Sequence, residues 1–122
     1  MKILLGVAIL VASSACALPQ HVELRIISRV AAEYRLDGFE TAMMRAIRKH
    51  ENGSVGLEFG VINPRARRFR DPYKSFRCQA QWCAGTISRR FTGSIKSFAI
   101  RYCRDDWRNW ERSVKSIMLR DK

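Results

Sequence analysis

The chain has 122 residues, with 23 lysine or arginine and 11 aspartate or glutamate residues that give a net charge of +12. A chain of this length forms one small domain, and its positive charge favours an anionic partner such as nucleic acid, acidic lipid or the polymers of a cell wall. Only two histidines are present and the cysteines lack a paired spacing, which argues against a zinc site, so neither a metal nor another cofactor is expected.

The first 17 residues have the pattern of a secretion signal. Lys2 supplies a charged start, residues 3–12 form an unbroken apolar run, and residues 13–17 are small. The apolar run is shorter than the roughly 20 residues that a membrane-spanning helix needs. We therefore expect an exported chain, periplasmic or secreted, in which residues 1–17 are the signal and residues 18–122 are the domain.

The end of this signal permits two modes of processing. Ordinary cleavage would follow residue 17. Alternatively, residues 14–16 resemble the lipobox of a bacterial lipoprotein, so that residues 1–15 would be removed and Cys16 lipidated, although Ser13 replaces the usual large aliphatic residue. An exported basic chain meets anionic wall polymer or a membrane surface, and no nucleic-acid partner is expected.

Five helices are predicted from apolar residues that recur every three or four positions. Their expected ranges are 19–34, 37–51, 75–90, 94–102 and 106–118. Asp37 and Glu40 have the spacing of a capping box at the start of the second helix. Asn52-Gly53 can adopt the left-handed conformation that ends this helix. The sequence therefore predicts a mostly α-helical domain.

The apolar stripes also predict which side chains face the core. Trp82 is expected to be buried, and the spacing of Trp107 and Trp110 indicates that both are buried or half-buried. The expected core-facing residues of the second helix are Phe39, Met43, Ile47 and His50.

Two segments without helical periodicity follow the second helix. Residues 53–61 alternate apolar residues with three glycines, which is typical of a short β-hairpin or an irregular loop. Residues 63–73 contain two prolines and should form an exposed loop. The loop could bind anionic polymer or phospholipid, although a solvated basic loop is the commoner role. Its basic residues are Arg65, Arg67, Arg68 and Arg70.

Three cysteines lie in the expected domain, namely Cys78, Cys83 and Cys103. Export permits disulfides, and an odd number of cysteines leaves one thiol unpaired. We expect a disulfide between Cys83 and Cys103, which would join two predicted helices. A disulfide between Cys78 and Cys103 is the alternative.

Glu51 is the residue whose position most favours catalysis. It ends an amphipathic helix, where the negative end of the helix dipole disfavours a carboxylate and favours the protonated acid. A glutamic acid that stays protonated near neutral pH can protonate the leaving oxygen of a sugar. From the residues alone, a solvated glutamate that happens to end a helix is the commoner case.

Two segments around Glu51 resemble the lytic transglycosylase and goose-type lysozyme superfamily. In that family a helix ending Tyr-Gly-Leu/Val-Asp leads into a second helix that ends Ala-Ile-x-x-x-Glu-Ser/Asn-Gly. This chain has Tyr-Arg-Leu-Asp at 34–37 and Ala-Ile-Arg-Lys-His-Glu-Asn-Gly at 46–53, and Ala-Ile-Arg-Tyr at 99–102 is similar to a later Ala-x-x-Tyr. The resemblance covers residues 26–118 and implies a lysozyme-like fold.

The resemblance implies a glycosidase that degrades peptidoglycan. Glu51 would cleave the β-1,4 bond between N-acetylmuramic acid and N-acetylglucosamine, with Tyr102 near the scissile bond. A lytic transglycosylase needs only this one carboxylate, whereas a hydrolase needs a second acid to activate water, for which Glu58 and Asp71 are available. The expected substrate-binding residues are Asn52, Phe59 and Gly60.

The chain departs from the family in two motifs. Phe-Gly-Val-Ile at residues 59–62 stands near the place of Gly-Leu-Met-Gln, and Cys-Arg-Asp at residues 103–105 replaces Asn-Ala-Gly. These departures support an alternative function, because a fold alone does not establish activity. In that alternative the chain is a catalytically inactive, basic secreted protein or lipoprotein that binds the cell wall or a membrane surface. In either case we expect a monomer.

Overall fold

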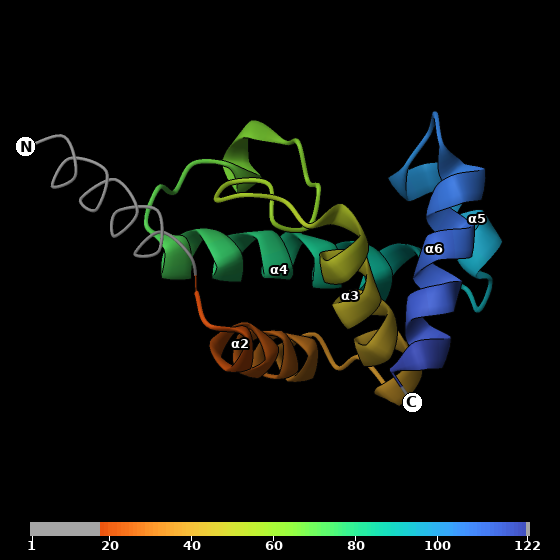
Figure 1. The fold of residues 1–122 in the computed structure, drawn as a ribbon, viewed down its shortest axis with the longest axis horizontal. Coiled ribbons are helices and arrows are strands. Elements are labelled where there is room, and N and C mark those ends of the chain that lie inside the picture. Colours follow the sequence, from red (N-terminus) through yellow and green to blue (C-terminus); the bar gives the residue numbers. More distant parts are fainter. Residues whose placement is uncertain (1–17, 122) are drawn as a thin grey trace, which may run out of the picture.

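The structure, a computed structural model, describes residues 18–121, so the expected signal in residues 1–17 lies outside the described part. Five α-helices, one short 3-10 helix and no strand make up residues 18–121 (Figure 1). The elements are α2 (Gln20–Glu33), α3 (Gly38–Glu51), η1 (Pro64–Ala66), α4 (Pro72–Arg90), α5 (Ile95–Tyr102) and α6 (Trp107–Arg120). The prediction of a mostly helical domain is confirmed.

Capping residues that are visible in the sequence determine the helix boundaries. The amide of Glu40 donates to Asp37 at 2.8 Å, and the amide of Asp37 donates to the Glu40 side chain at 3.0 Å, which is the predicted capping box. Asn52 ends α3 with a φ of 46°, in the left-handed region. Helix α4 starts three residues before its predicted start because Asp71 caps it and Pro72 suits the first helical position.

Helix α4 is the central element of the fold. Helix α2 packs along one side of α4, and the segment 52–71 lies on the other side (Figure 1). Helix α3 packs against α6, which also contacts α5. The core forms where these helices meet. Its largest fully buried aromatic side chains are Trp110, Phe59, Phe76 and Phe98.

Several predicted core positions are confirmed. Met43 and Ile47 of α3 are fully buried, and His50 is half-buried. On α6, Trp110 is buried and Trp107 is half-buried. The helical periodicity therefore identified the inner faces of both helices correctly.

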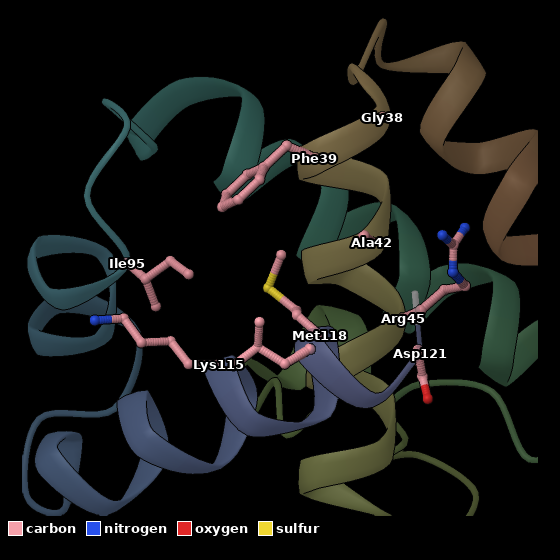
Figure 2. Close-up of a pocket in the computed structure, with 9 residues that line it drawn as sticks. Gly38, Phe39, Ala42, Arg45, Ile95, Lys115, Met118 and Asp121 are labelled. Carbon is pink, nitrogen blue, oxygen red and sulfur yellow. The ribbon is translucent and has the colours of Figure 1, made fainter.

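Two predicted core residues are less buried than expected. Phe39 is 50% exposed because the first turn of α3 borders an open pocket of about 600 Å³, which Ile95 and Met118 also line (Figure 2). Its ring stacks on Phe91 at a centroid distance of 5.8 Å. Trp82 is half-buried because it lines an open cavity together with Tyr34 and Arg89.

Candidate functional site

The segment that follows α3 consists of turns and contains no hairpin. The amide of Leu57 donates to the carbonyl of Ser54 at 2.8 Å, and the amide of Gly60 donates to the carbonyl of Leu57 at 2.9 Å. Of the two alternatives for residues 53–61, the irregular loop is correct and the β-hairpin is wrong. The reason is that this backbone bonds to itself within turns and to side chains of α3 and α4, so it forms no ladder with a second strand.

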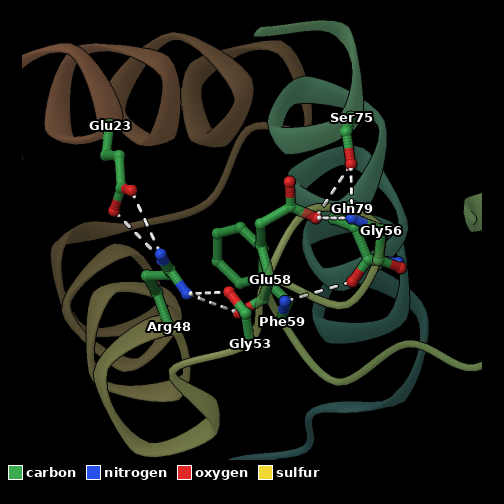
Figure 3. A network of polar contacts seen from close by, with 8 residues as sticks. All are labelled: Glu23, Arg48, Gly53, Gly56, Glu58, Phe59, Ser75 and Gln79. Atoms are coloured by element: carbon green, nitrogen blue, oxygen red, sulfur yellow. Dashed lines mark hydrogen bonds and ion pairs between the residues drawn. The ribbon is translucent and has the colours of Figure 1, made fainter. Parts of the chain in front are cut away.

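The side chain of Gln79, in α4, anchors this loop by hydrogen bonds to its backbone. Its side chain is fully buried, and its Oε1 accepts the amides of Phe59 at 3.1 Å and Val61 at 3.3 Å. Its Nε2 donates to the carbonyls of Gly56, Val61 and Ala66 at 2.9 to 3.0 Å. Figure 3 shows the amide directed at the loop. Sequence reasoning did not single out Gln79, although a polar residue on the apolar face of a helix is the signal that would identify it.

The side chain of Arg48, in α3, also forms hydrogen bonds to the backbone of this loop. Its Nη1 donates to the carbonyls of Gly53 at 3.0 Å and Glu58 at 3.1 Å (Figure 3). The rest of its guanidinium makes a bidentate pair with Glu23 of α2, at 3.0 and 3.1 Å. A bidentate pair fixes the guanidinium in one orientation. Side-chain hydrogen bonds therefore connect the loop after α3 directly to α3 and α4, and Arg48 links it further to α2.

Glu58 belongs to this structural network. It is only 4% exposed, and its Oε1 accepts the amide of Gly56 and the hydroxyl of Ser75, both at 3.0 Å (Figure 3). Glu58 was expected as an available second acid for a hydrolase, and here these contacts take up its carboxylate. Asp71, the other candidate base, caps α4. Both acids are occupied by contacts that organise the backbone.

Glu51 is the last residue of α3 and is half-buried. The indole nitrogen of Trp110 donates to its Oε2 at 2.8 Å. Its Oε1 lies against the backbone of Gly60, where an added Cβ would stand 2.4 Å from that oxygen. Gly60 also has a φ of +73°, which favours glycine. The carboxylate is therefore held between an indole donor and a glycine that leaves room for it.

Tyr102, at the end of α5, completes this site. Its hydroxyl donates to the carbonyl of Phe59 at 2.6 Å, and its ring lies 5.3 Å from that of Trp110. Burial raises the pKa of Tyr102 well above its usual value, and the neighbouring Cys83 and Glu51 raise it further. The phenol therefore stays protonated and acts as a hydrogen-bond donor. The structure thus brings Glu51, Gly60 and Tyr102 together at one site.

The other predicted substrate-binding residues are placed differently. The side chain of Phe59 is fully buried and packs edge-on against Phe76 at 5.2 Å, so it cannot contact a substrate. The burial follows from the turn at 57–60, which directs this ring to the core and leaves only its carbonyl for Tyr102. Asn52 is exposed and serves as the C-cap of α3.

The predicted disulfide is not formed, and Cys78, Cys83 and Cys103 are free thiols. Consecutive side chains at the end of α5 point in directions about 100° apart. Tyr102 lies beside the thiol of Cys83, and the next side chain, Cys103, is therefore directed elsewhere. Sequence spacing alone could not show which of the adjacent residues Tyr102 and Cys103 would face Cys83.

We expect the buried thiol of Cys83 to resist alkylation. Burial raises its pKa to about 12 from an ordinary value of 9.0, so the reactive thiolate is scarce at neutral pH. Iodoacetamide at pH 8 should modify half-buried Cys103 and leave Cys83 unmodified unless denaturant is added, as measured by peptide mass spectrometry. The folded state holds the Cys83 proton more tightly than the unfolded state does. The free energy of unfolding is therefore highest below pH 9 and falls as the pH rises towards about 12. Equal labelling of both cysteines in the native protein would contradict this assignment.

No known protein family, curated protein or solved structure matches this chain. Within residues 18–121, no helix is long and apolar enough to cross a membrane. The same residues contain no group of three histidine, cysteine or acidic side chains that could hold a metal ion. The candidate site is therefore assigned from its own geometry, as a single oriented carboxylate beside a protonated phenol.

Proposed function

We propose that this chain is a glycosidase that cleaves the β-1,4 bond between N-acetylmuramic acid and N-acetylglucosamine in peptidoglycan, with Glu51 as the catalytic acid. One observation carries the proposal: Glu51 ends α3 with its carboxylate held between the indole of Trp110 and the backbone of Gly60. A solvated glutamate at a helix end would not have such partners. The similarity of residues 30–53 to the lytic transglycosylase and goose-type lysozyme superfamily supports the same assignment.

The two oxygens of Glu51 have different surroundings, which suits proton transfer. Oε2 already accepts the Trp110 hydrogen bond, which leaves Oε1 as the oxygen that would carry the transferred proton in the proposed reaction. That proton passes to the glycosidic oxygen as its bond to the muramoyl anomeric carbon breaks, which releases N-acetylglucosamine as an alcohol. Tyr102, whose phenol stays protonated, stands close to this carboxylate.

The placement of the other acids favours a lytic transglycosylase over a hydrolase. A hydrolase needs a second carboxylate to activate water or to act as the nucleophile. Glu58 is buried in the loop network and Asp71 caps α4, so neither supplies that group. In a transglycosylase the Glu51 carboxylate takes the proton of the muramoyl 6-hydroxyl. The hydroxyl oxygen then bonds to the anomeric carbon and closes a 1,6-anhydro ring.

The proposal includes a lysozyme-like arrangement around α3 and export to the periplasm or the cell exterior, where peptidoglycan is found. The expected signal in residues 1–17, with or without lipidation of Cys16, supports export. The net charge of +12 supports binding to the anionic wall or to a membrane surface.

Mass spectrometry of the products released from purified peptidoglycan tests the proposal. We expect the full-length protein to release muropeptides that are lighter by one water molecule than hydrolytic products. Ordinary reducing-end products would overturn the transglycosylase assignment and leave a lysozyme. No release by a protein whose circular dichroism shows an intact helical fold would overturn the enzymatic proposal. That result would favour a basic protein that only binds the wall or membrane.

A further inference from the structure

A second cavity lies on a different face of α4 from the candidate catalytic site. Its volume is about 370 Å³. Side chains of an α-helix advance by about 100° per residue, so Trp82, Gly85 and Arg89 share one face while Gln79 and Cys83 share another. Tyr34, after α2, and Arg68, from the loop before α4, close the cavity from its sides.

Two arginine residues border this cavity. Arg68 and Arg89 both line it and both are exposed. Within residues 18–121 neither forms an ion pair, whereas Arg48 and Arg77 each pair with a glutamate. Two like charges at one cavity repel each other unless an anion lies between them. The arrangement therefore favours a ligand with negatively charged oxygens, which guanidinium groups bind in a bidentate manner.

Gly85 makes this arrangement possible. A glycine inside a helix costs about 1 kcal/mol relative to alanine, so its presence in α4 needs a reason. An added Cβ would stand 3.1 Å from Nη1 of Arg89 and 3.3 Å from Cε2 of Tyr34. Both side chains lie close against the helix backbone here, and a side chain at residue 85 would push them outward by a few tenths of an ångström. Gly85 thus forms the floor of the cavity.

The remaining lining suits a sugar ring. Trp82 is half-buried at the cavity, which leaves part of an indole accessible where the sequence predicted a core residue. Aromatic faces pack well against the apolar face of a pyranose. The amide of Gln81 and the hydroxyl of Tyr34 add groups that can donate to or accept from sugar hydroxyls.

We propose that this cavity is a binding site for an anionic sugar, that is, a carbohydrate that carries a carboxylate or a phosphate. Arg68 and Arg89 bind the anionic group, and Trp82 packs against the ring. The site is separate from Glu51, so it goes beyond the proposed glycosidase and does not require catalysis. In an enzyme that acts on a wall polymer, such a site would hold the polymer at a second point and strengthen binding by multivalency.

Isothermal titration calorimetry with small sugars tests this proposal. The probes are N-acetylmuramic acid, which carries a carboxylate, glucosamine 6-phosphate, which carries a phosphate, and uncharged N-acetylglucosamine. We expect the full-length protein to bind at least one anionic sugar and to bind N-acetylglucosamine at least about tenfold more weakly. Binding of neither anionic sugar, or equal binding of all three, would overturn the proposal. The stronger of the two anionic probes identifies the charged group.

Four variants test where the sugar binds. Arg89→Gln and Gly85→Ala should each weaken binding of the anionic sugar at least about tenfold, the loss expected for one charge-assisted hydrogen bond. Arg90→Gln removes the same charge from the adjacent, exposed residue, which does not line the cavity, and should leave binding unchanged. Equal weakening by Arg90→Gln would show a non-specific charge effect and overturn the site. Glu51→Gln should bind as the native protein does, because this site functions whether or not the chain is a glycosidase.

Discussion

Replacing Glu51 by glutamine is expected to abolish the release of muropeptides, with a loss of at least about a hundredfold and up to about ten-thousandfold. Glutamine keeps the shape of the side chain, and its amide oxygen can still accept the Trp110 hydrogen bond. It has no acidic proton to give to the glycosidic oxygen and cannot take the proton of the 6-hydroxyl. The initial rate of muropeptide release, measured by liquid chromatography, gives the size of the loss.

A matched variant separates this effect from a change of charge. Glu33→Gln makes the same substitution at the end of α2, in an exposed side chain that pairs with Arg77. This variant should release muropeptides at the native rate, because surface ion pairs contribute roughly 0–1 kcal/mol to stability. If Glu51→Gln kept more than half of the native rate, another acid would have to perform the reaction.

Replacing Gln79 by leucine is expected to lower the free energy of unfolding by roughly 3–5 kcal/mol. Leucine is similar in volume, but it leaves the backbone amides of Phe59 and Val61 and three carbonyls without their partner. Each unsatisfied buried polar group costs about 1–3 kcal/mol, and local opening of the loop to water reduces the sum. A domain of this size has a total stability of roughly 5–15 kcal/mol, so the loss is a large fraction.

Urea unfolding followed by circular dichroism measures this loss. Gln81→Leu is the matched control, because it makes the same change two residues along α4, at a partly exposed position. The control should change the free energy of unfolding by less than about 0.5 kcal/mol. A Gln79→Leu protein as stable as the control would show that the loop is held by other contacts, with Arg48 as the first candidate.

Local signals in the sequence predicted most of the helical framework. The Asp37 capping box, the left-handed cap at Asn52 and the apolar periodicity of α3 and α6 are interactions between residues a few positions apart. Such interactions are the same in any tertiary context, so the sequence by itself identified the helices and the mostly α-helical class. It also identified Glu51 as a carboxylate at a helix end, which is a local property.

Only the tertiary structure decided how side chains from distant segments meet. The sequence could not show that Gln79 would bond to the loop at 56–66, or that Glu58 would be buried against Ser75. It also could not show that Tyr102 would reach Cys83 where a disulfide was expected. These outcomes depend on how helices pack across tens of residues, and a change of one position along a helix turns a side chain by about 100°. For this reason the sequence determined the helices, whereas their packing determined which residues surround Glu51.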